Sequence, residues 1–215
     1  MDSMPDRAIL FIDGNNWYHS MKDVGLSDLM RLDYSKISQK LAGPRDWLET
    51  RYYIGRVEQS GNSRLYSDQR SFLGALQATD PRISVHLRRL EPRPVEDPGA
   101  KELFGYLQDL KVRIDTRVYH DLWKLARKHL RTKVMVEKAV DVMIAVDMVM
   151  MAYQDRYDAA YILSADGDYT PVAREVRRLG KKIYAASPAS GAQLAAAVNT
   201  FIRLQASWFG DCYRS

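Results

Sequence analysis

The sequence predicts an α/β fold in which a mostly parallel sheet is covered by helices on both faces. Strand-like and helix-like segments alternate along the chain, which is typical of a parallel sheet with crossover helices. Two apolar strand-like runs, residues 8–12 and 159–163, are each closely followed by aspartate, and an unusually apolar helix-like run occupies residues 136–153. At 215 residues, the chain is long enough to build one domain with a substantial core.

The first half of the chain predicts three strands and three helices. The opening strand turns at Asp13-Gly14 into a helix that continues through Met21. Apolar residues at helical spacing indicate a second long helix over residues 64–78. The other elements predicted here are a short helix at residues 34–41 and strands at residues 50–57 and 83–90.

The middle of the chain carries weaker signals. Three prolines and a glycine predict a loop over residues 91–100. We expect a strand at residues 111–119 and a short basic helix at residues 121–130. The segment from about residue 92 to residue 134 matches no motif, so we expect an insertion there in a single domain of residues 1–215.

After this segment the alternation resumes. The apolar helix at residues 136–153 leads to a strand at residues 157–163. Thr170 is expected to cap the next helix, with Pro171 at its first position and Gly180 just past its end. Its inner face is expected to carry Val172, Val176 and Leu179. The last predicted elements are a strand at residues 181–186, a helix at residues 193–198 and an edge strand at residues 200–204.

Composition narrows the classes of protein to which the chain can belong. A formal net charge of +5 and an isoelectric point near 9.2 favour a polyanionic partner. No apolar run reaches membrane-spanning length, and the first residues lack the basic start and apolar middle of a signal peptide. The single cysteine, Cys212, excludes an internal disulfide and a cysteine zinc site. We therefore expect a cytoplasmic protein without membrane association, and the oligomeric state stays open, a homo-oligomer included.

Three aspartate-bearing segments far apart in the chain are expected to meet at one edge of the sheet. Asp13 and Asp166 follow strands, and the carboxyl ends of parallel strands lie at one edge, where ligands bind. Asp141 lies in the apolar helix, where an unpartnered carboxylate is costly to bury. Converging carboxylates repel one another unless a hard cation such as Mg²⁺ or Mn²⁺ binds among them. The pattern predicts metal-assisted phosphoryl chemistry, with Asp168 as a fourth acid.

Each acid also has a structural interpretation. Asp13 is well placed to cap the helix that follows it, and Asp168 to favour the first turn of a helix. Asp141 would form a surface pair with Lys138, because Glu137, Lys138 and Asp141 share a face if the helix already includes them. In the functional interpretation, Lys138 instead contacts phosphate.

Three further polar residues are expected to support the site, and several other chemistries are excluded. Asn16 would cap the helix or orient Asp13 and a water, and Ser164 would position a water or a phosphate oxygen. Asp147 lies on another face of its helix, which favours a structural role. The chain has neither GxGxxG nor a P-loop, and its histidines lack zinc spacing. Asn15 stands where a phosphatase with a phospho-aspartate intermediate needs a second aspartate.

These motifs, in this order, resemble those of the NYN domain family within the PIN-like metal-dependent nucleases. The match runs through ILFIDGNN at residues 9–16, EKAVDVMIAVD at residues 137–147 and AYILSADGDYTP at residues 160–171. The resemblance implies a Rossmann-like three-layer α/β/α sandwich with Mg²⁺ or Mn²⁺ at the carboxyl edge of the sheet. It also implies that the metal-binding and catalytic acids are Asp13, Asp141, Asp166 and Asp168, assisted by Asn16, and that Asp147 belongs to the family pattern.

We therefore expect a metal-dependent endoribonuclease that hydrolyses phosphodiester bonds of RNA. Basic side chains would follow the RNA backbone. The candidates are Arg51, Arg56, Lys138, Arg174, Arg177 and Arg178, together with Lys124 and Arg127 in a basic stretch that contains Trp123. Trp123 would stack on a base, or else lie in the core of a helix whose other face is solvated. Two other functions remain open: a non-catalytic RNA-binding or scaffold protein, and a DNA or flap nuclease, since an acidic site does not sense the 2′-hydroxyl.

Overall fold

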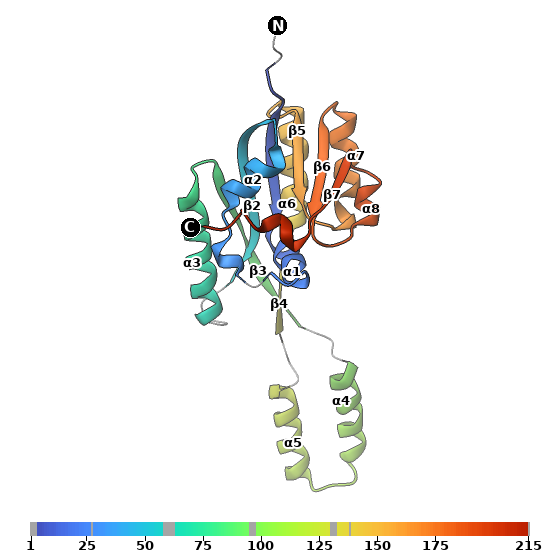
Figure 1. Cartoon of the computed structure of the whole chain (residues 1–215). Helices are drawn as coiled ribbons and strands as arrows, with labels where there is room; N and C mark the ends of the chain where they lie inside the picture. The colour runs from blue at the N-terminus through green and yellow to red at the C-terminus, as the bar shows by residue number, and fades with distance from the viewer. Residues whose placement is uncertain are drawn as a thin grey trace. The chain divides into compact units, whose positions relative to one another are not determined.

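The computed structural model describes residues 4–26, 28–57, 63–94, 98–129, 133–137 and 139–214. The chain divides into two compact units, one of residues 1–89 with 137–215 and the other of residues 90–136 (Figure 1). The second unit contains the segment in which the sequence carries no recognisable motif. The residues of each unit contact mainly other residues of the same unit.

A mostly parallel sheet forms the centre of the first unit, as the sequence predicts. Its strands are β1 (Arg7–Asp13), β2 (Asp46–Arg56), β3 (Ile83–Pro94), β5 (Ala159–Leu163), β6 (Lys182–Ser187) and β7 (Thr200–Arg203), and β4 (Lys133–Glu137) is next to β3. The order is β4-β3-β2-β1-β5-β6-β7, and the pairs from β3 through β7 are parallel. The chain therefore adds strands on one side of β1 first and on the other side later, which makes the boundary between β1 and β5 the topological switch point.

Helices cover both faces of this sheet and complete the predicted three-layer sandwich (Figure 1). The helices of one face are α1 (Gly14–Asp23), α2 (Tyr34–Ala42) and α3 (Ser63–Thr79), and those of the other are α6 (Val140–Tyr153) and α7 (Thr170–Arg178). Successive residues of β1 point to opposite faces. Leu10 and Ile12 therefore pack in the core with α1, α2 and α3, whereas Ile9 and Phe11 pack in the core with α6 and α7.

α6 begins four residues later than the sequence predicts. Residues 133–137 form β4, and Ala139 then takes a left-handed conformation with a φ of 64°, so the helix begins at Val140. The expectation that Glu137 shares a helix face with Asp141 is therefore wrong. Glu137 belongs to β4, Lys138 lies outside the described residues, and Asp141 lies in the first turn of α6.

α6 is also buried on one side only, although its composition predicts burial nearly all round. Val142, Val146 and Met150 lie on the other side and are 58%, 53% and 47% exposed. Among the described residues, no helix combines the length and the apolar character that crossing a membrane requires. The buried residues of α6 recur at helical spacing and are Val140, Ile144, Met148, Met151 and Ala152.

The described part of the second unit contains the end of β3, most of β4 and two helices, α4 (Pro98–Leu110) and α5 (Thr116–His129). The loop expected over residues 91–100 is wrong, because β3 continues to Pro94 and α4 begins at Pro98. Proline is favourable at the first position of a helix, where a missing N–H costs no helical hydrogen bond. Pro92 and Pro94 therefore lie in a strand, and Pro98 is the first residue of a helix.

The strand expected over residues 111–119 is wrong as well, since α5 begins within it. The carboxylate of Asp115 accepts hydrogen bonds from the backbone N–H groups of Arg117 and Val118, at 2.9 and 3.4 Å. A carboxylate in that position caps a helix. The basic helix expected at residues 121–130 is thus longer than predicted and starts at Thr116.

The last part of the first unit differs from the prediction mainly at its helix ends. Thr170 is the first residue of α7 and Tyr169 precedes it, so Thr170 does not cap the helix, whereas Pro171 lies in its first turn as predicted. Asp166 caps a short 3₁₀ helix, η2 (Gly167–Tyr169), which runs into α7. The helix expected at residues 193–198 is shorter, and the remaining short helices are α8 (Ala192–Ala195), η1 (Leu29–Arg31) and η3 (Ala206–Phe209).

Candidate active site

The candidate active site lies where β1 and β5 end, at the switch point of the sheet. Asp13 is the last residue of β1, and Asp166 lies just beyond the end of β5. The two strands are paired, with Ile12 beside Leu163. The fold therefore brings together two acidic motifs that are far apart in the sequence, at the position where open α/β sheets bind ligands.

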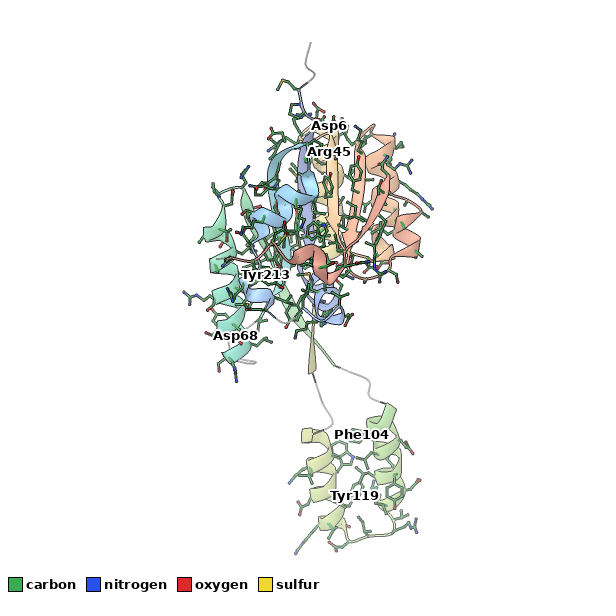
Figure 2. All side chains as sticks on the ribbon, viewed as in Figure 1. Asp6, Arg45, Asp68, Phe104, Tyr119 and Tyr213 are labelled. Atoms are coloured by element: carbon green, nitrogen blue, oxygen red, sulfur yellow. The ribbon has the colours of Figure 1, made fainter. Side chains whose placement is uncertain are left out.

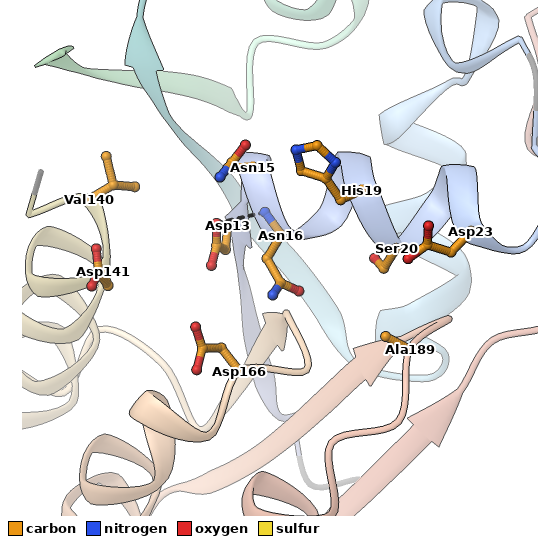
Figure 3. Close-up of a pocket in the computed structure, with 10 residues that line it drawn as sticks. All are labelled: Asp13, Asn15, Asn16, His19, Ser20, Asp23, Val140, Asp141, Asp166 and Ala189. Atoms are coloured by element: carbon orange, nitrogen blue, oxygen red, sulfur yellow. Dashed lines mark hydrogen bonds between the residues drawn. The ribbon is translucent and has the colours of Figure 1, made fainter. Parts of the chain in front are cut away.

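Asp13 is buried and held by three donors from two segments. Its Oδ1 accepts a hydrogen bond from the backbone N–H of Asn16 at 3.2 Å, which caps α1 (Figure 3). Its Oδ2 accepts hydrogen bonds from the hydroxyl groups of Tyr169 and Ser164, at 3.1 and 3.5 Å. Asp13 therefore caps α1 through Oδ1, while its Oδ2 is held by the segment that follows β5.

Asn16 and Ser164 link the ends of the two strands. The backbone N–H of Ala165 donates to Oδ1 of Asn16 at 3.2 Å, so the Asn16 side chain, on α1, holds the turn after β5. The hydroxyl of Ser164 accepts a hydrogen bond from the backbone N–H of Asp166 at 3.1 Å. Both side chains thus position backbone around the acids.

Gly14 allows α1 to start close to the neighbouring strand. A Cβ atom built at this position would lie 2.7 Å from the backbone oxygen of Tyr53 and 2.6 Å from the ring of Tyr52. Both distances are shorter than real Cβ contacts. A side chain at residue 14 would therefore push α1, and with it Asn16, away from the sheet.

An open cavity of about 370 Å³ lies beside these residues and contains three of the four predicted acids (Figure 3). Asp13, Asp141 and Asp166 approach it from β1, α6 and the turn after β5. Asp168 is exposed and is not part of the lining, and its backbone N–H instead donates to Asp166 at 2.9 Å. The other lining residues are Asn15, Asn16, His19, Ser20, Asp23, Val140 and Ala189.

The environment of Asp13 disfavours its charge. Burial raises the pKa of Asp13, and the neighbouring carboxylates of Asp166 and Asp141 raise it further. The donors Asn16 and Tyr169 oppose this effect without cancelling it. Burial also raises the pKa of Tyr169, and the nearby carboxylates add to the shift, so its hydroxyl remains a hydrogen-bond donor at neutral pH.

The acids provide the kind of donor that a hard divalent cation needs, since carboxylate oxygens are the preferred ligands of Mg²⁺ and Mn²⁺. The mutual repulsion recorded at Asp13 is the effect that a bound cation would relieve. Within the described part of the chain, however, no three Asp, Glu, His or Cys side chains stand close enough together to enclose a metal ion. Asp141 and Asp166 would therefore have to turn toward Asp13 to share a cation with it.

Asp147 and Arg51 belong to an internal polar cluster. The hydroxyl of Tyr53 donates to Asp147 at 2.7 Å, and a guanidinium nitrogen of Arg51 lies 3.4 Å from the same carboxylate. Arg51 also lies 3.5 Å from Glu49, and its Nε donates to His86 at 3.1 Å. Asp147 thus binds neighbouring segments of the chain. The side chain of Arg51 is 18% exposed and has internal partners, although the sequence predicts that it contacts RNA.

The other predicted RNA-binding residues are less constrained. Arg56 at the end of β2 and Arg174 on α7 are exposed. Arg177 donates to the backbone oxygen of Ala197 at 3.1 Å, and Arg178 forms an exposed pair with Glu175. In the second unit, Lys124 is exposed on α5, whereas the side chain of Arg127 and all of Lys138 lie outside the described residues.

Several polar residues at this site, among them His19, Asp23 and Tyr169, are not predicted from the sequence. His19 and Asp23 line the cavity because they follow Asn15 and Asn16 at helical spacing on α1, a signal that was present in the sequence. Tyr169 was missed for a different reason. It reaches Asp13 only because η2 turns it inward, and no spacing rule predicts a 3₁₀ helix there.

Comparisons with known proteins agree with this fold. The NYN domain family model matches residues 7–205, which is nearly the whole chain. A crystal structure of a protein of unknown function from Vibrio parahaemolyticus is similar, with a TM-score of 0.57 and 15% identity, covering 94% of this chain and 94% of that one. At this identity the likeness shows the fold alone. A search of curated proteins found no match.

Proposed function

This chain belongs to the NYN domain family, whose members are generally nucleases with a PIN-like fold, and we propose that it is a metal-dependent ribonuclease. In this proposal the active site is the acidic pocket at the ends of β1 and β5. The observation that carries it is that Asp13, Asp141 and Asp166 line one cavity, where burial raises the pKa of Asp13 and the charges of Asp166 and Asp141 raise it further. Carboxylate charges gathered in one pocket repel one another, and a bound cation would offset this repulsion.

Asp13, Asp141 and Asp166 would hold Mg²⁺ or Mn²⁺, and the exposed Asp168 would act through water. When bound, such an ion polarises a phosphodiester and lowers the pKa of a coordinated water. The surrounding groups fix the acids. Tyr169, Ser164 and the backbone of Asn16 hold both oxygens of Asp13, so that its carboxylate is oriented before substrate binds.

Basic side chains around the acidic pocket would hold the RNA backbone. The formal net charge of +5 includes the acids of the pocket, so the remaining surface is more positive than this value. Arg56, at the carboxyl end of β2, and Arg174, on α7, are the best candidates because both are exposed and lie on elements of the first unit. Arg177, Arg178, Lys124 and Arg127 remain candidates for more distant contacts. The internal partners of Arg51 leave it out of the proposed surface.

The experiment that tests this proposal compares substrates and metals. Purified protein would be incubated with a labelled single-stranded RNA and a DNA of the same sequence, each with Mn²⁺, with Mg²⁺ or with EDTA. We expect cleavage of RNA that requires a metal and is abolished by EDTA. RNA binding without cleavage in any metal would support a non-catalytic RNA-binding protein instead, and preferential cleavage of DNA would indicate a DNA nuclease.

A further inference from the structure

The helical hairpin formed by α4 and α5 has little core of its own. Among its described side chains, Leu107 is buried, at 5% exposure. Isolated segments of about 40 residues rarely bury enough apolar surface to be stable without a partner. Five other large apolar side chains of the two helices are between 39% and 58% exposed: Leu103, Tyr106, Val118, Leu122 and Leu125.

These five residues form one continuous face, which we call the apolar face. The rings of Phe104 and Trp123 are in contact, with centroids 6.0 Å apart, and this contact marks the seam between the two helices. Figure 2 labels Phe104 on α4 and Tyr119 on α5. Each residue of a helix turns about 100° from the one before. Relative to this seam, the exposed apolar residues of α4 and those of α5 fall on the same side of the antiparallel hairpin. The hairpin therefore presents a two-helix-wide apolar surface.

Among the described side chains, the two edges of the apolar face differ in charge, one being acidic and the other having an excess of basic residues. Glu102 and Asp109 are exposed along the outer edge of α4. Arg117 and Lys124 are exposed along the outer edge of α5, which also carries Asp121. Because Phe104 lies beside Trp123, Asp109 is level with the start of α5, near Arg117, and Glu102 is level with Lys124.

We propose that two copies of this chain pair through the apolar face, so that their hairpins form an antiparallel four-helix bundle. A two-fold axis parallel to the helices places α4 of one copy over α5 of the other. The acidic edge of each copy then meets the basic edge of its partner. A two-fold axis perpendicular to the helices would place α4 over α4 and bring the acidic residues together.

A second copy suits this face better than a nucleic acid does. Among the described side chains, the face itself is apolar and the charges lie at its edges, whereas an RNA-binding surface would have to present its positive charge in the middle. The face is also complementary to itself in both charge and apolar character, as an isologous interface requires. The exposed side of α6, with Val142, Val146 and Met150, is a separate apolar surface that the test must distinguish.

The first test measures the mass of the full chain by analytical ultracentrifugation over a range of concentrations. We expect a dimer, and we expect Leu122→Glu combined with Leu125→Glu to weaken dimerisation by roughly a hundredfold or more, because four apolar side chains are lost from the interface. Two matched controls replace an exposed valine outside the apolar face. These are Val112→Glu in the turn between α4 and α5, where Val112 is 89% exposed, and Val146→Glu on α6. Both should dimerise like the unaltered chain.

The second test distinguishes contacts between copies from contacts within one. Asp109→Arg and Arg117→Asp, prepared as separate proteins, each place like charges across the interface and should weaken self-association roughly tenfold or more. In a mixture of the two proteins, the heterodimer restores opposite charges at both positions. We therefore expect dimerisation of the mixture to recover.

Three results would overturn the proposal. A chain that stays monomeric at all concentrations has its apolar face covered within the same molecule. A dimer that survives the leucine substitutions, or that is broken by Val146→Glu, uses another surface such as α6. If the mixture of charge variants does not recover, α4 does not lie over α5 of the partner. Circular dichroism of each variant shows whether its helices are retained.

Discussion

The hydrogen bond between Tyr169 and Asp13 should contribute measurably to the stability of the metal-free protein. The hydroxyl lies 3.1 Å from Oδ2 of Asp13, and the two residues are 2% and 9% exposed. A hydrogen bond to a charged group contributes about 1.5–3 kcal/mol, and Tyr169→Phe removes the donor while keeping the ring. In EDTA at neutral pH we therefore expect Tyr169→Phe to lower the free energy of unfolding by this amount. For a chain of this length it corresponds to a fall in Tm of about 3–12 °C.

The charge of Asp13 decides the size of this effect. In the Asp13→Asn background the acceptor is neutral, so Tyr169→Phe should cost only about 0.5–1.5 kcal/mol. Tyr157→Phe is the matched control, because the Tyr157 hydroxyl is buried too but donates to a neutral acceptor, the backbone oxygen of Met148, at 2.7 Å. Its cost should be the same in the unaltered chain as in the Asp13→Asn background.

Thermal and urea unfolding of the single and double variants measure these differences. The reasoning is refuted if Tyr169→Phe changes stability by less than about 0.5 kcal/mol, the range of an ordinary surface substitution. It is also refuted if the cost of Tyr169→Phe is equal in the two backgrounds, because the acceptor would then carry no charge that the hydroxyl stabilises.

Three other predictions concern the pocket and its surroundings. Burial and the neighbouring acids raise the pKa of Asp13 in the folded state, so this residue's contribution to stability is fully present below the unfolded pKa of about 4 and is lost as pH rises through the folded pKa. Asp13→Asn should therefore raise Tm in EDTA at neutral pH and leave Tm nearly unchanged at pH 3. It should also reduce the increase in Tm that Mn²⁺ produces. A lower Tm in EDTA together with a full Mn²⁺ shift would show that Asp13 only caps α1. Asp168→Asn should reduce cleavage less than tenfold, since Asp168 is exposed outside the pocket lining, and a loss as large as that of Asp141→Asn would place it among the direct ligands. Arg174→Glu should flatten the salt dependence of RNA binding by about one unit of the log–log slope, measured by fluorescence anisotropy in EDTA, and an unchanged slope would exclude Arg174 from the binding surface.

The parallel sheet and the position of the acids could be predicted because they depend on local, strong patterns. The apolar runs that became β1 and β5 are buried, and the aspartates that follow them reach the same edge as a consequence of parallel pairing. The place of Asp13 in the site is thus a property of topology. Its hydrogen bond to Tyr169 depends on the turn of η2, which has no sequence pattern of its own.

The segment around the second unit was harder to predict because its signals are ambiguous. Pro98 is as compatible with a loop as with the start of a helix, and the capping role of Asp115 is evident only in the structure. The sequence predicts the start of α6 four residues too early because Val136 extends its apolar pattern, while the left-handed conformation of Ala139 just before α6 leaves no trace in composition. Burial of α6 was overestimated for a similar reason, since Val142 and Val146 are apolar but face outward.

The most direct test of the account is the cleavage rate of Asp141→Asn in Mn²⁺ under single-turnover conditions, measured beside its RNA affinity. The substitution keeps the shape of the side chain at the pocket and removes its carboxylate charge. We expect the rate to fall by about a hundredfold or more, as is usual when a group acting in the transition state is removed, while RNA affinity is maintained or improved. Asp68→Asn, which removes an exposed carboxylate on α3, is the control and should cleave at the unaltered rate. Cleavage by Asp141→Asn at the rate of the unaltered chain would contradict the assignment of the active site.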